Sequence, residues 1–169
     1  GNGLPKFTFG WNNSLKYGNW DANFFFRGAV GHDILNSYRG FYENTEGTTL
    51  DNYNVVNTKY FDANIKKAAV NNTHVEKGDF IKLDNATIGY NVNVGQSSMI
   101  NKLRVFVAGQ NLFVITKYTG IDPEVRWQDQ IDGDGGGGAG GVDPFAPGIE
   151  RRSTYFTTRT ITFGVNLSF

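Results

Sequence analysis

The chain ends on Arg159-Thr-Ile-Thr-Phe-Gly-Val-Asn-Leu-Ser-Phe169, in which two kinds of side chain alternate. Apolar residues occupy the odd positions Ile161, Phe163, Val165, Leu167 and Phe169, and small or polar residues occupy the even positions between them. Successive side chains of a β-strand point to opposite faces, so this stretch predicts a strand with one apolar and one polar face. This pattern is typical of a transmembrane β-barrel, in which each strand separates lipid from a polar lumen.

Four earlier stretches carry similar alternation and predict strands at about 6–17, 20–30, 79–94 and 102–115, and the terminal strand extends over about 155–169. Only Gly18-Asn19 separates the first two strands, and such a pair suits the positive φ angles of a two-residue hairpin turn. In the third strand the apolar positions change parity near Asp84-Asn85, which predicts a β-bulge there.

Short and long connections alternate along the chain. Gly18-Asn19 and residues 95–101 are short, whereas 31–78 and 116–154 are long and polar, and the second long one contains the glycine-rich segment 133–141. A weak helical pattern lies within the first, over 62–70. Bacterial outer-membrane barrels have short periplasmic turns and long extracellular loops, so we expect 31–78 and 116–154 to be extracellular loops.

Five strands are too few to close a barrel, since single-chain barrels begin at about eight strands. An open sheet in lipid would leave backbone groups unpaired at both edges, at several kcal/mol each. We therefore expect an all-β fold in which residues 1–169 form the C-terminal portion of a larger antiparallel transmembrane β-barrel.

Composition excludes several classes of function. The 169 residues include 16 basic and 16 acidic side chains without a basic run, so we expect no nucleic-acid partner. There is no cysteine, which excludes disulfides and thiolate chemistry. No apolar run approaches the roughly 20 residues of a membrane-spanning helix. Aromatic residues make up 15% of the chain, as the aromatic girdles of a barrel require.

Several segments resemble one family. Asn101-Lys-Leu-Arg-Val-Phe-Val-Ala-Gly-Gln-Asn-Leu-Phe-Val-Ile-Thr-Lys-Tyr-Thr-Gly-Ile-Asp-Pro-Glu-Val125 resembles the penultimate-strand signature of the SusC/RagA-type TonB-dependent outer-membrane transporters of Bacteroidetes. Segments 4–17, 24–36, 79–90 and 159–169 are similar to further strands of the same family, in the family's order.

The resemblance implies a barrel of about 22 strands with an N-terminal plug, located in the cell outer membrane. It implies import of oligosaccharides or peptides, driven through the TonB complex, with a SusD-like surface lipoprotein over the barrel and a dimer of such complexes. Terminal Phe169 matches the C-terminal signal by which outer-membrane barrels are recognised for assembly. The expected partners of this chain are thus the rest of the barrel, the plug, the lipoprotein and outer-membrane lipid.

Polar residues of the predicted strands are candidates for lining the lumen and contacting cargo, namely Arg27, Asn23, Arg104, Gln110 and Arg159. The alternative is that these side chains pair with one another, with Asp21, or with the plug. Trp11, Tyr17 and Trp20 are expected to be lipid and interface anchors, together with Phe169.

Catalysis and cofactors have little support in the sequence. Asp122 and Glu124 are two residues apart, but we interpret them as a structural loop entrance. Asp132 and Asp134 are weak candidates for Ca²⁺ ligands in an extracellular loop, without the bidentate Glu of an EF-hand. His32 and His74 are interpreted as surface residues rather than zinc ligands. We expect no enzyme activity and no resident cofactor.

Two other classes of protein remain open at this point. A secreted β-sandwich that binds glycans would pack the apolar strand faces sheet on sheet and need no detergent. An outer-membrane enzyme on a small barrel would need at least about three more strands and a recognisable pair of nucleophile and base.

Overall fold

The computed structural model describes residues 1–43, 59, 64, 71–95, 99–125, 147–150 and 156–169. The chain forms two compact units. The sheet unit comprises Phe7–Ala29, Phe80–Thr116 and Thr157–Phe169, and the loop unit comprises Gly1–Lys6, Val30–Asp79 and Lys117–Phe156. Among the described residues, no helix has both the length and the apolar character needed to cross a membrane.

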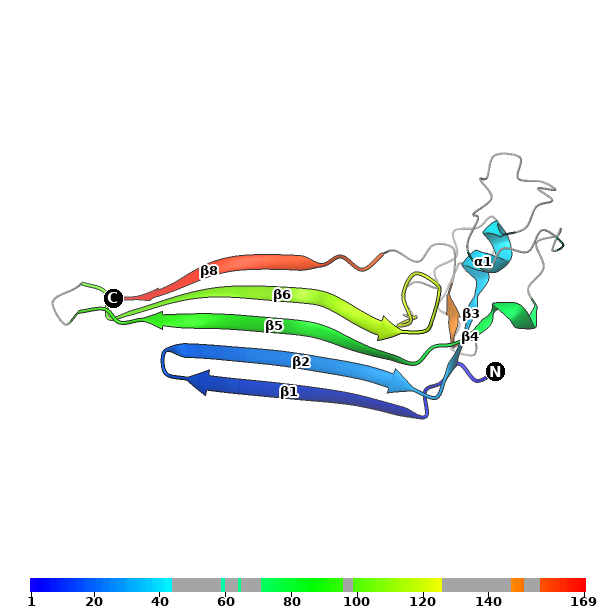
Figure 1. Cartoon of the computed structure of the whole chain (residues 1–169), viewed down its shortest axis with the longest axis horizontal. Helices are drawn as coiled ribbons and strands as arrows, with labels where there is room; N and C mark the ends of the chain where they lie inside the picture. Colours follow the sequence, from blue (N-terminus) through cyan, green and yellow to red (C-terminus); the bar gives the residue numbers. More distant parts are fainter. Residues whose placement is uncertain (44–58, 60–63, 65–70, 96–98, 126–146, 151–155) are drawn as a thin grey trace, which may run out of the picture. The chain divides into compact units, whose positions relative to one another are not determined.

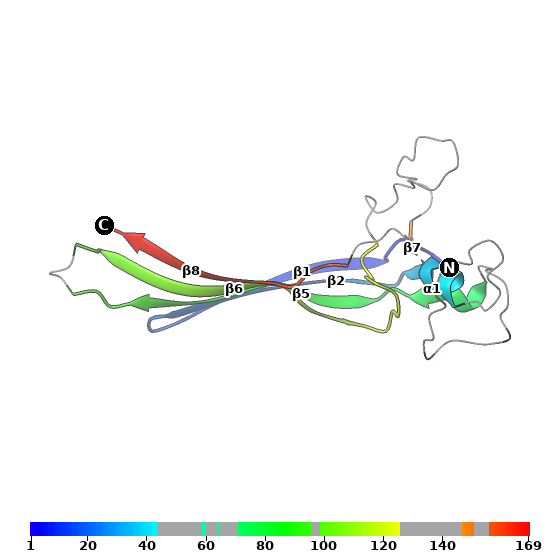
Figure 2. The same ribbon diagram turned by 90° about the horizontal axis from the view of Figure 1, so that it is seen from above.

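The sheet unit is one five-stranded sheet in the order β1-β2-β5-β6-β8, and Figure 1 shows these strands side by side as arrows of alternating direction. Its strands are β1 (Phe7–Tyr17), β2 (Trp20–Val30), β5 (Phe80–Val92), β6 (Lys102–Thr116) and β8 (Thr160–Ser168). The ladders β2–β5, β5–β6 and β6–β8 are antiparallel. The five long strands that the alternation predicts are therefore present, each beside its neighbour in the chain, and Figure 2 shows the twist of the sheet.

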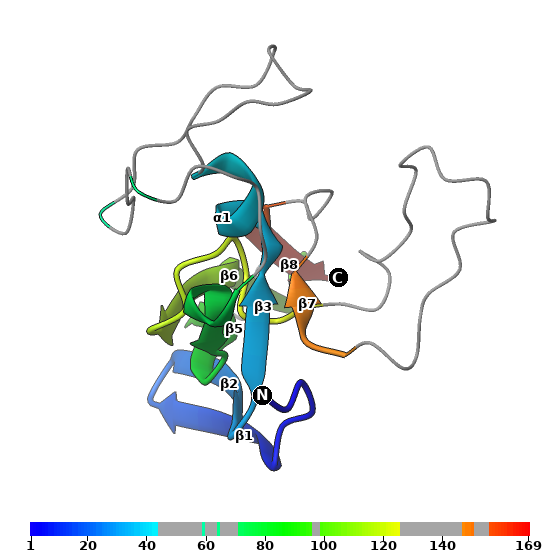
Figure 3. The same cartoon turned by 90° about the vertical axis from the view of Figure 1, so that its right-hand side faces the viewer.

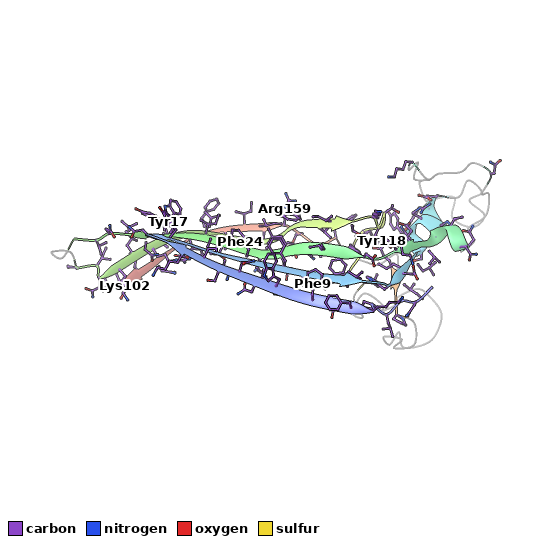
Figure 4. The ribbon with its side chains drawn as sticks, turned by 60° about the horizontal axis from the view of Figure 1, so that its bottom comes forward. Phe9, Tyr17, Phe24, Lys102, Tyr118 and Arg159 are labelled. Carbon is purple, nitrogen blue, oxygen red and sulfur yellow. The ribbon has the colours of Figure 1, made fainter. Side chains whose placement is uncertain are left out.

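The strand register gives the sheet one continuous apolar face. Cross-strand partners place Trp20, Tyr90, Val105 and Val165 in one row, and the next such row is Ala22, Ile88, Val107 and Phe163. The rings of Trp20 and Tyr90 lie 4.8 Å apart. The rings of Trp11 and Phe26 stack at 5.7 Å, which adds β1 to this face. Figure 4 shows side chains on both faces of the strands, with Phe9 and Phe24 labelled.

A bulge interrupts the ladders at the predicted place. The register of β2 with β5 shifts between Phe25 and Phe26, and that of β5 with β6 shifts between Leu83 and Asn85. Asp84 is the extra residue of β5 against β2. Against β6, Asp84 faces two residues, Asn111 and Leu112, and Leu83 pairs with Phe113 beyond them. The prediction from the parity change near Asp84-Asn85 is confirmed, because one extra residue is what lets apolar side chains of both parities share a face.

The last strand begins later than the alternation indicates. β8 starts at Thr160, and its ladder with β6 ends at the pair Gln110–Thr160. The next residue of β6, Asn111, has φ of 51° and donates its side-chain amide to the carbonyl oxygen of Thr158 at 3.1 Å. A left-handed residue turns the backbone away from regular pairing, so the ladder stops there. The predicted strand 155–169 is therefore too long.

The loop unit, which includes the described residues of the predicted long loops 31–78 and 116–154, has short strands and a helix that the sequence pattern did not predict. β3 (Asp33–Asn36) pairs antiparallel with β4 (Val75–Lys77) and parallel with β7 (Ile149–Glu150). Helix α1 (Ser37–Tyr42) follows β3, and the 3₁₀ turn η1 (Asn72–His74) precedes β4. Figure 3 shows β3 beside β7, with α1 continuing from β3.

These elements are too short to carry a readable period. β3 has four residues and β7 two, so neither spans enough alternations to stand out from a polar segment. The end of β3 also caps the helix, since the Asn36 side-chain oxygen accepts from the backbone N–H of Arg39 at 3.1 Å. The weak helix predicted over 62–70 lies, apart from Asn64, outside the described residues.

Candidate functional site

The apolar face of the sheet is exposed. Phe163 is 78% exposed, Trp11 59% and Val165 58%, and Phe169 at the chain end is 80% exposed. Large apolar side chains on five adjoining strands form a surface that water does not favour, far beyond the scattered exposed residues of ordinary soluble domains. The sheet therefore presents a face suited to lipid, and its ladders pair backbone groups between neighbouring strands, whereas the edge strands β1 and β8 would need further strands beside them in a bilayer.

The polar face carries an ion pair that crosses three strands. Arg104 of β6 donates from Nε to the Asp21 carboxylate of β2 at 2.9 Å, and Asn91 of β5 donates to the same oxygen at 3.1 Å. The guanidinium carbon lies 5.2 Å from the ring centre of Phe106. The guanidinium also occupies the space beside Gly89, where an added Cβ would lie 2.3 Å from Nη2. The pair is thus a fixed part of this face.

A second ion pair lies at the bulge. Nε of Arg27 on β2 lies 3.0 Å from Asp84 of β5, and both side chains are about three-quarters buried. Arg27 is paired across the ladder with Lys82, so Asp84 also reduces the repulsion between two facing cations. Arg27 and Arg104, proposed as lumen-facing residues, are therefore each engaged with a carboxylate. The Arg104–Asp21 pair is one of the pairings that the sequence left open, whereas the sequence did not indicate Asp84 as a partner of Arg27.

The other three candidates differ in position. Asn23 of β2 pairs in the ladder with Thr87, and Gln110 of β6 pairs with Asn85 and Thr160, so both belong to the polar face. Arg159 precedes β8 and has the parity of Ile161, so the register does not group it with the others. It is exposed, and Figure 4 labels it at this end of β8. That any of these residues contacts cargo stays a prediction.

The loop unit contains a partly buried carboxylate hub at Glu76. Its oxygens accept from Arg39 Nη1 at 2.7 Å, from Asn36 at 3.1 Å, and from both the backbone N–H and the hydroxyl of Thr119. Arg39 also donates from Nε to Glu43 at 3.0 Å. Burial raises the pKa of Glu76, but the hydrogen bonds from Thr119 and Arg39 outweigh it and the pKa is lowered overall. Glu76 is therefore ionised and joins β3, α1 and the segment after β6.

A second hub is Glu150 of β7, which is fully buried. One carboxylate oxygen accepts from the Tyr118 hydroxyl at 2.6 Å, and the other accepts from the backbone N–H groups of Ile121 and Asp122, each at 2.9 Å. Burial raises the pKa of Glu150 despite these bonds, and burial beside Glu150 raises the pKa of Tyr118. An added Cβ on Gly120 would lie 2.1 Å from the carboxylate, so a larger residue there would displace the Glu150 side chain.

The two histidines are buried, contrary to the interpretation of surface residues. His32 is 6% exposed and His74 3%. Burial, and then the charge of Arg39, lower the pKa of His74, whose Nδ1 accepts from the Asn71 backbone N–H at 3.3 Å. In the part of the chain that the structure describes, no group of three or more His, Cys, Asp or Glu side chains is placed to hold a metal ion. The Ca²⁺ candidates Asp132 and Asp134 lie outside that part.

Asp122 and Glu124 fit the interpretation of a structural loop entrance. The Asp122 carboxylate accepts from the Glu124 backbone N–H at 2.9 Å, which forms a tight local turn. Neither hub, Glu76 or Glu150, is predicted by the sequence pattern, because a lone Glu in a polar segment carries no periodic signal. The segment Tyr118-Thr-Gly-Ile-Asp122 belongs to the stretch that resembles the family signature, and it supplies the hydrogen-bond donors that these two carboxylates bind. That resemblance was the signal in the sequence that could have indicated the two hubs.

Known proteins resemble this chain over most or all of its length. It is 30% identical over 178 aligned residues to TonB-dependent receptor P3 of Formosa agariphila, covering 100% of this chain and 17% of that protein. It is 25% identical over 129 aligned residues to TonB-dependent receptor SusC of Bacteroides thetaiotaomicron, covering 69% of this chain and 12% of that protein. The chain thus spans less than a fifth of the length of these relatives. No family model matches the chain.

Solved structures show the same fold. The structure of the RagAB peptide transporter superimposes with a TM-score of 0.67 and 23% sequence identity, covering 99% of this chain and 17% of that one. The RagAB peptide importer in its open-open state gives a TM-score of 0.60 at the same identity. At this identity the likeness concerns the fold alone, namely a segment of an antiparallel β-barrel.

Proposed function

Because this chain belongs to the SusC/RagA-type family of TonB-dependent receptors, we propose that it is a wall segment of an outer-membrane transporter. As a member of this family it is not an enzyme. Its role is to separate lipid from a polar interior while neighbouring strands of the same barrel complete the wall. The relatives are several times longer than this chain, so transport itself would be performed by the complete protein.

The observation that carries the proposal is the two-faced sheet. One face exposes Trp11, Phe163, Val165 and their neighbours, and the other carries the Asp21–Arg104 and Arg27–Asp84 ion pairs. Lipid tolerates the first face but disfavours the second strongly, since an Arg or Lys at the bilayer midplane costs about 2–4 kcal/mol. A polar interior, in contrast, favours the face with the ion pairs over the apolar face. The sheet is therefore suited to a barrel wall.

The cargo and the partners are a further step of the same proposal. We propose import of oligosaccharides or peptides, TonB-driven, with a SusD-like surface lipoprotein, and location in the outer membrane. Support comes from the likeness to SusC by sequence and to the RagAB peptide transporter by fold. Arg27, Asn23, Arg104 and Gln110 are the residues of this chain from which we expect any contact with cargo or plug.

The proposal is tested on the complete protein that carries this chain. A deletion strain should fail to grow on one class of oligosaccharide or peptide as limiting nutrient, and the protein should fractionate with the outer membrane and require detergent for solubility. A soluble protein that needs no detergent would contradict the membrane assignment. Normal growth of the deletion strain on every such nutrient would contradict import of these cargoes.

The β-sandwich alternative finds no support in the described residues. A sandwich would cover its apolar face with a second sheet, whereas the large apolar side chains of this sheet are exposed. The small sheet β4-β3-β7 has strands of two to four residues, too short to cover that face.

A further inference from the structure

The segment that follows β6 is fastened from two sides. We call residues 118–124 the strap. Its Thr119 is bound by Glu76, which comes from the first long connection, and its Tyr118, Ile121 and Asp122 are bound by Glu150, which comes from the second. Two carboxylates from distant parts of the chain therefore hold one short segment, and Tyr118, Asp122 and Pro123 of the strap are buried.

The two carboxylates differ in electrostatic compensation. Glu76 faces the Arg39 guanidinium at 2.7 Å, so its charge is matched by a cation. Glu150 receives only the Tyr118 hydroxyl and two backbone N–H groups, and no Lys or Arg of the described residues pairs with it. The Asp122 carboxylate adds a like charge nearby, and Glu76 and Arg39 act with opposite signs on the Tyr118 hydroxyl that Glu150 binds. From helix α1, the Ser37 hydroxyl donates to the backbone carbonyl of Glu150 and not to its carboxylate.

Burying a carboxyl group without a counter-ion is strongly unfavourable in free energy when the group is ionised and much less so when it is protonated. In the protonated form, one oxygen still accepts from the Ile121 and Asp122 N–H groups and the other still meets the Tyr118 hydroxyl. Protonation therefore removes the buried charge and keeps the contacts that hold the strap. Gly120 keeps the strap backbone close enough for this arrangement, since no Cβ fits beside the carboxylate.

We propose that Glu150 is a proton-controlled clasp of the strap, which holds residues 118–124 firmly when its carboxyl is protonated and loosens them when it is ionised. The protonated Glu150 carboxyl stabilises the folded strap fully below the ordinary pKa of Glu, and this stabilisation is lost as pH rises through the higher pKa that Glu150 has in the folded state. Glu76 keeps the strap attached at its Thr119 end over the same range, because it remains ionised and paired.

Hydrogen–deuterium exchange of the complete protein in detergent tests the clasp. The readout is the protection of the peptide covering 118–124, corrected for intrinsic exchange, between about pH 5 and 8. In the wild type we expect protection to fall as pH rises, by at most about tenfold per pH unit for one titrating group. In Glu150→Gln, which keeps an acceptor but cannot ionise, we expect protection that does not depend on pH.

Asp122→Asn is the matched control, because it removes the neighbouring carboxylate but leaves Glu150, so the pH dependence should persist. Protection of β5 peptides should be unchanged in each variant, which verifies folding of the sheet. Wild-type protection that is flat with pH would overturn the proposal. So would a fall that Glu150→Gln retains or that Asp122→Asn abolishes.

Tyr118→Phe gives an independent test should Glu150→Gln fail to accumulate. Removing the hydroxyl takes one hydrogen bond from the ionised carboxylate, so the pKa of Glu150 should rise further. We expect the loss of protection to move to higher pH. No shift, or a shift to lower pH, would overturn the proposal.

Discussion

Arg104 of β6 reaches Asp21 of β2 across Gly89 of the intervening strand, with 2.9 Å between Arg104 Nε and Asp21 Oδ1. The three residues come from three strands, and Gly89 pairs directly with Asp21 in the ladder. A side chain on the middle strand would occupy the path of the guanidinium. The glycine is therefore what permits a charge pair between strands that are not neighbours.

Substitution of this glycine should break the ion pair. In Gly89→Ala the new Cβ would lie 2.3 Å from Nη2, so the flexible guanidinium must move away from Asp21. We expect a loss of about 1 kcal/mol, the upper range for a partly exposed pair. Thermal unfolding of Gly89→Ala, Asp21→Asn and the double variant measures it. The double variant should be no less stable than the worse single one, and fully additive losses would contradict the mechanism.

Charges on the two faces of β8 should have unequal effects. Val165→Lys places a charge on the apolar face, where we expect a cost of up to about 2–4 kcal/mol in the bilayer, whereas Asn166→Lys places the same charge on the polar face at little cost. The yield of folded protein in the outer membrane measures the difference. Equal yields for the two variants would mean that the face of Val165 is not in lipid.

The side-chain size that position 164 tolerates should depend on the ring of Phe106. They pair directly between β6 and β8, and a Cβ on Gly164 would lie 2.2 Å from the Phe106 ring. Gly164→Val should therefore cost about 1–3 kcal/mol through overpacking against a rigid ring. Adding Phe106→Ala should restore much of this loss in thermal unfolding of the purified protein. Failure of the smaller side chain to restore stability would show that the clash is not with Phe106.

Removing the Glu76 charge should release the strap at its other end. Glu76→Gln takes the Glu76 carboxylate from buried Arg39, and breaking a buried pair costs about 3 kcal/mol. The pKa of Glu76 is lowered in the fold, so its contribution is present above about pH 4.5 and is lost as pH falls through the folded value. Hydrogen exchange at Thr119 should thus increase in acid in the wild type and be fast at every pH in the variant. This dependence is opposite in sign to that expected at Ile121 and Asp122.

Much of the sheet could be predicted from the sequence because strand alternation is a local property. Side chains two residues apart share a face whatever the strand pairs with, so the pattern alone locates the five strands, the Gly18-Asn19 turn and the bulge near Asp84. The loop unit could not be predicted, since β3 and β7 are short and the pairing of Leu35 with Ile149 joins residues far apart in the chain.

Local patterning is thus enough to define a two-faced antiparallel sheet suited to a barrel wall, because alternation over long strands separates the apolar side chains from the polar ones. The partners of the polar residues, in contrast, follow only from the three-dimensional fold. The Asp21–Arg104 pair depends on the register of three strands, and the hydrogen bonds of Glu76 and Glu150 to the strap span 43 and 28 residues of chain. Desolvation and ion pairing act through space, so they are fixed only once distant segments are brought together.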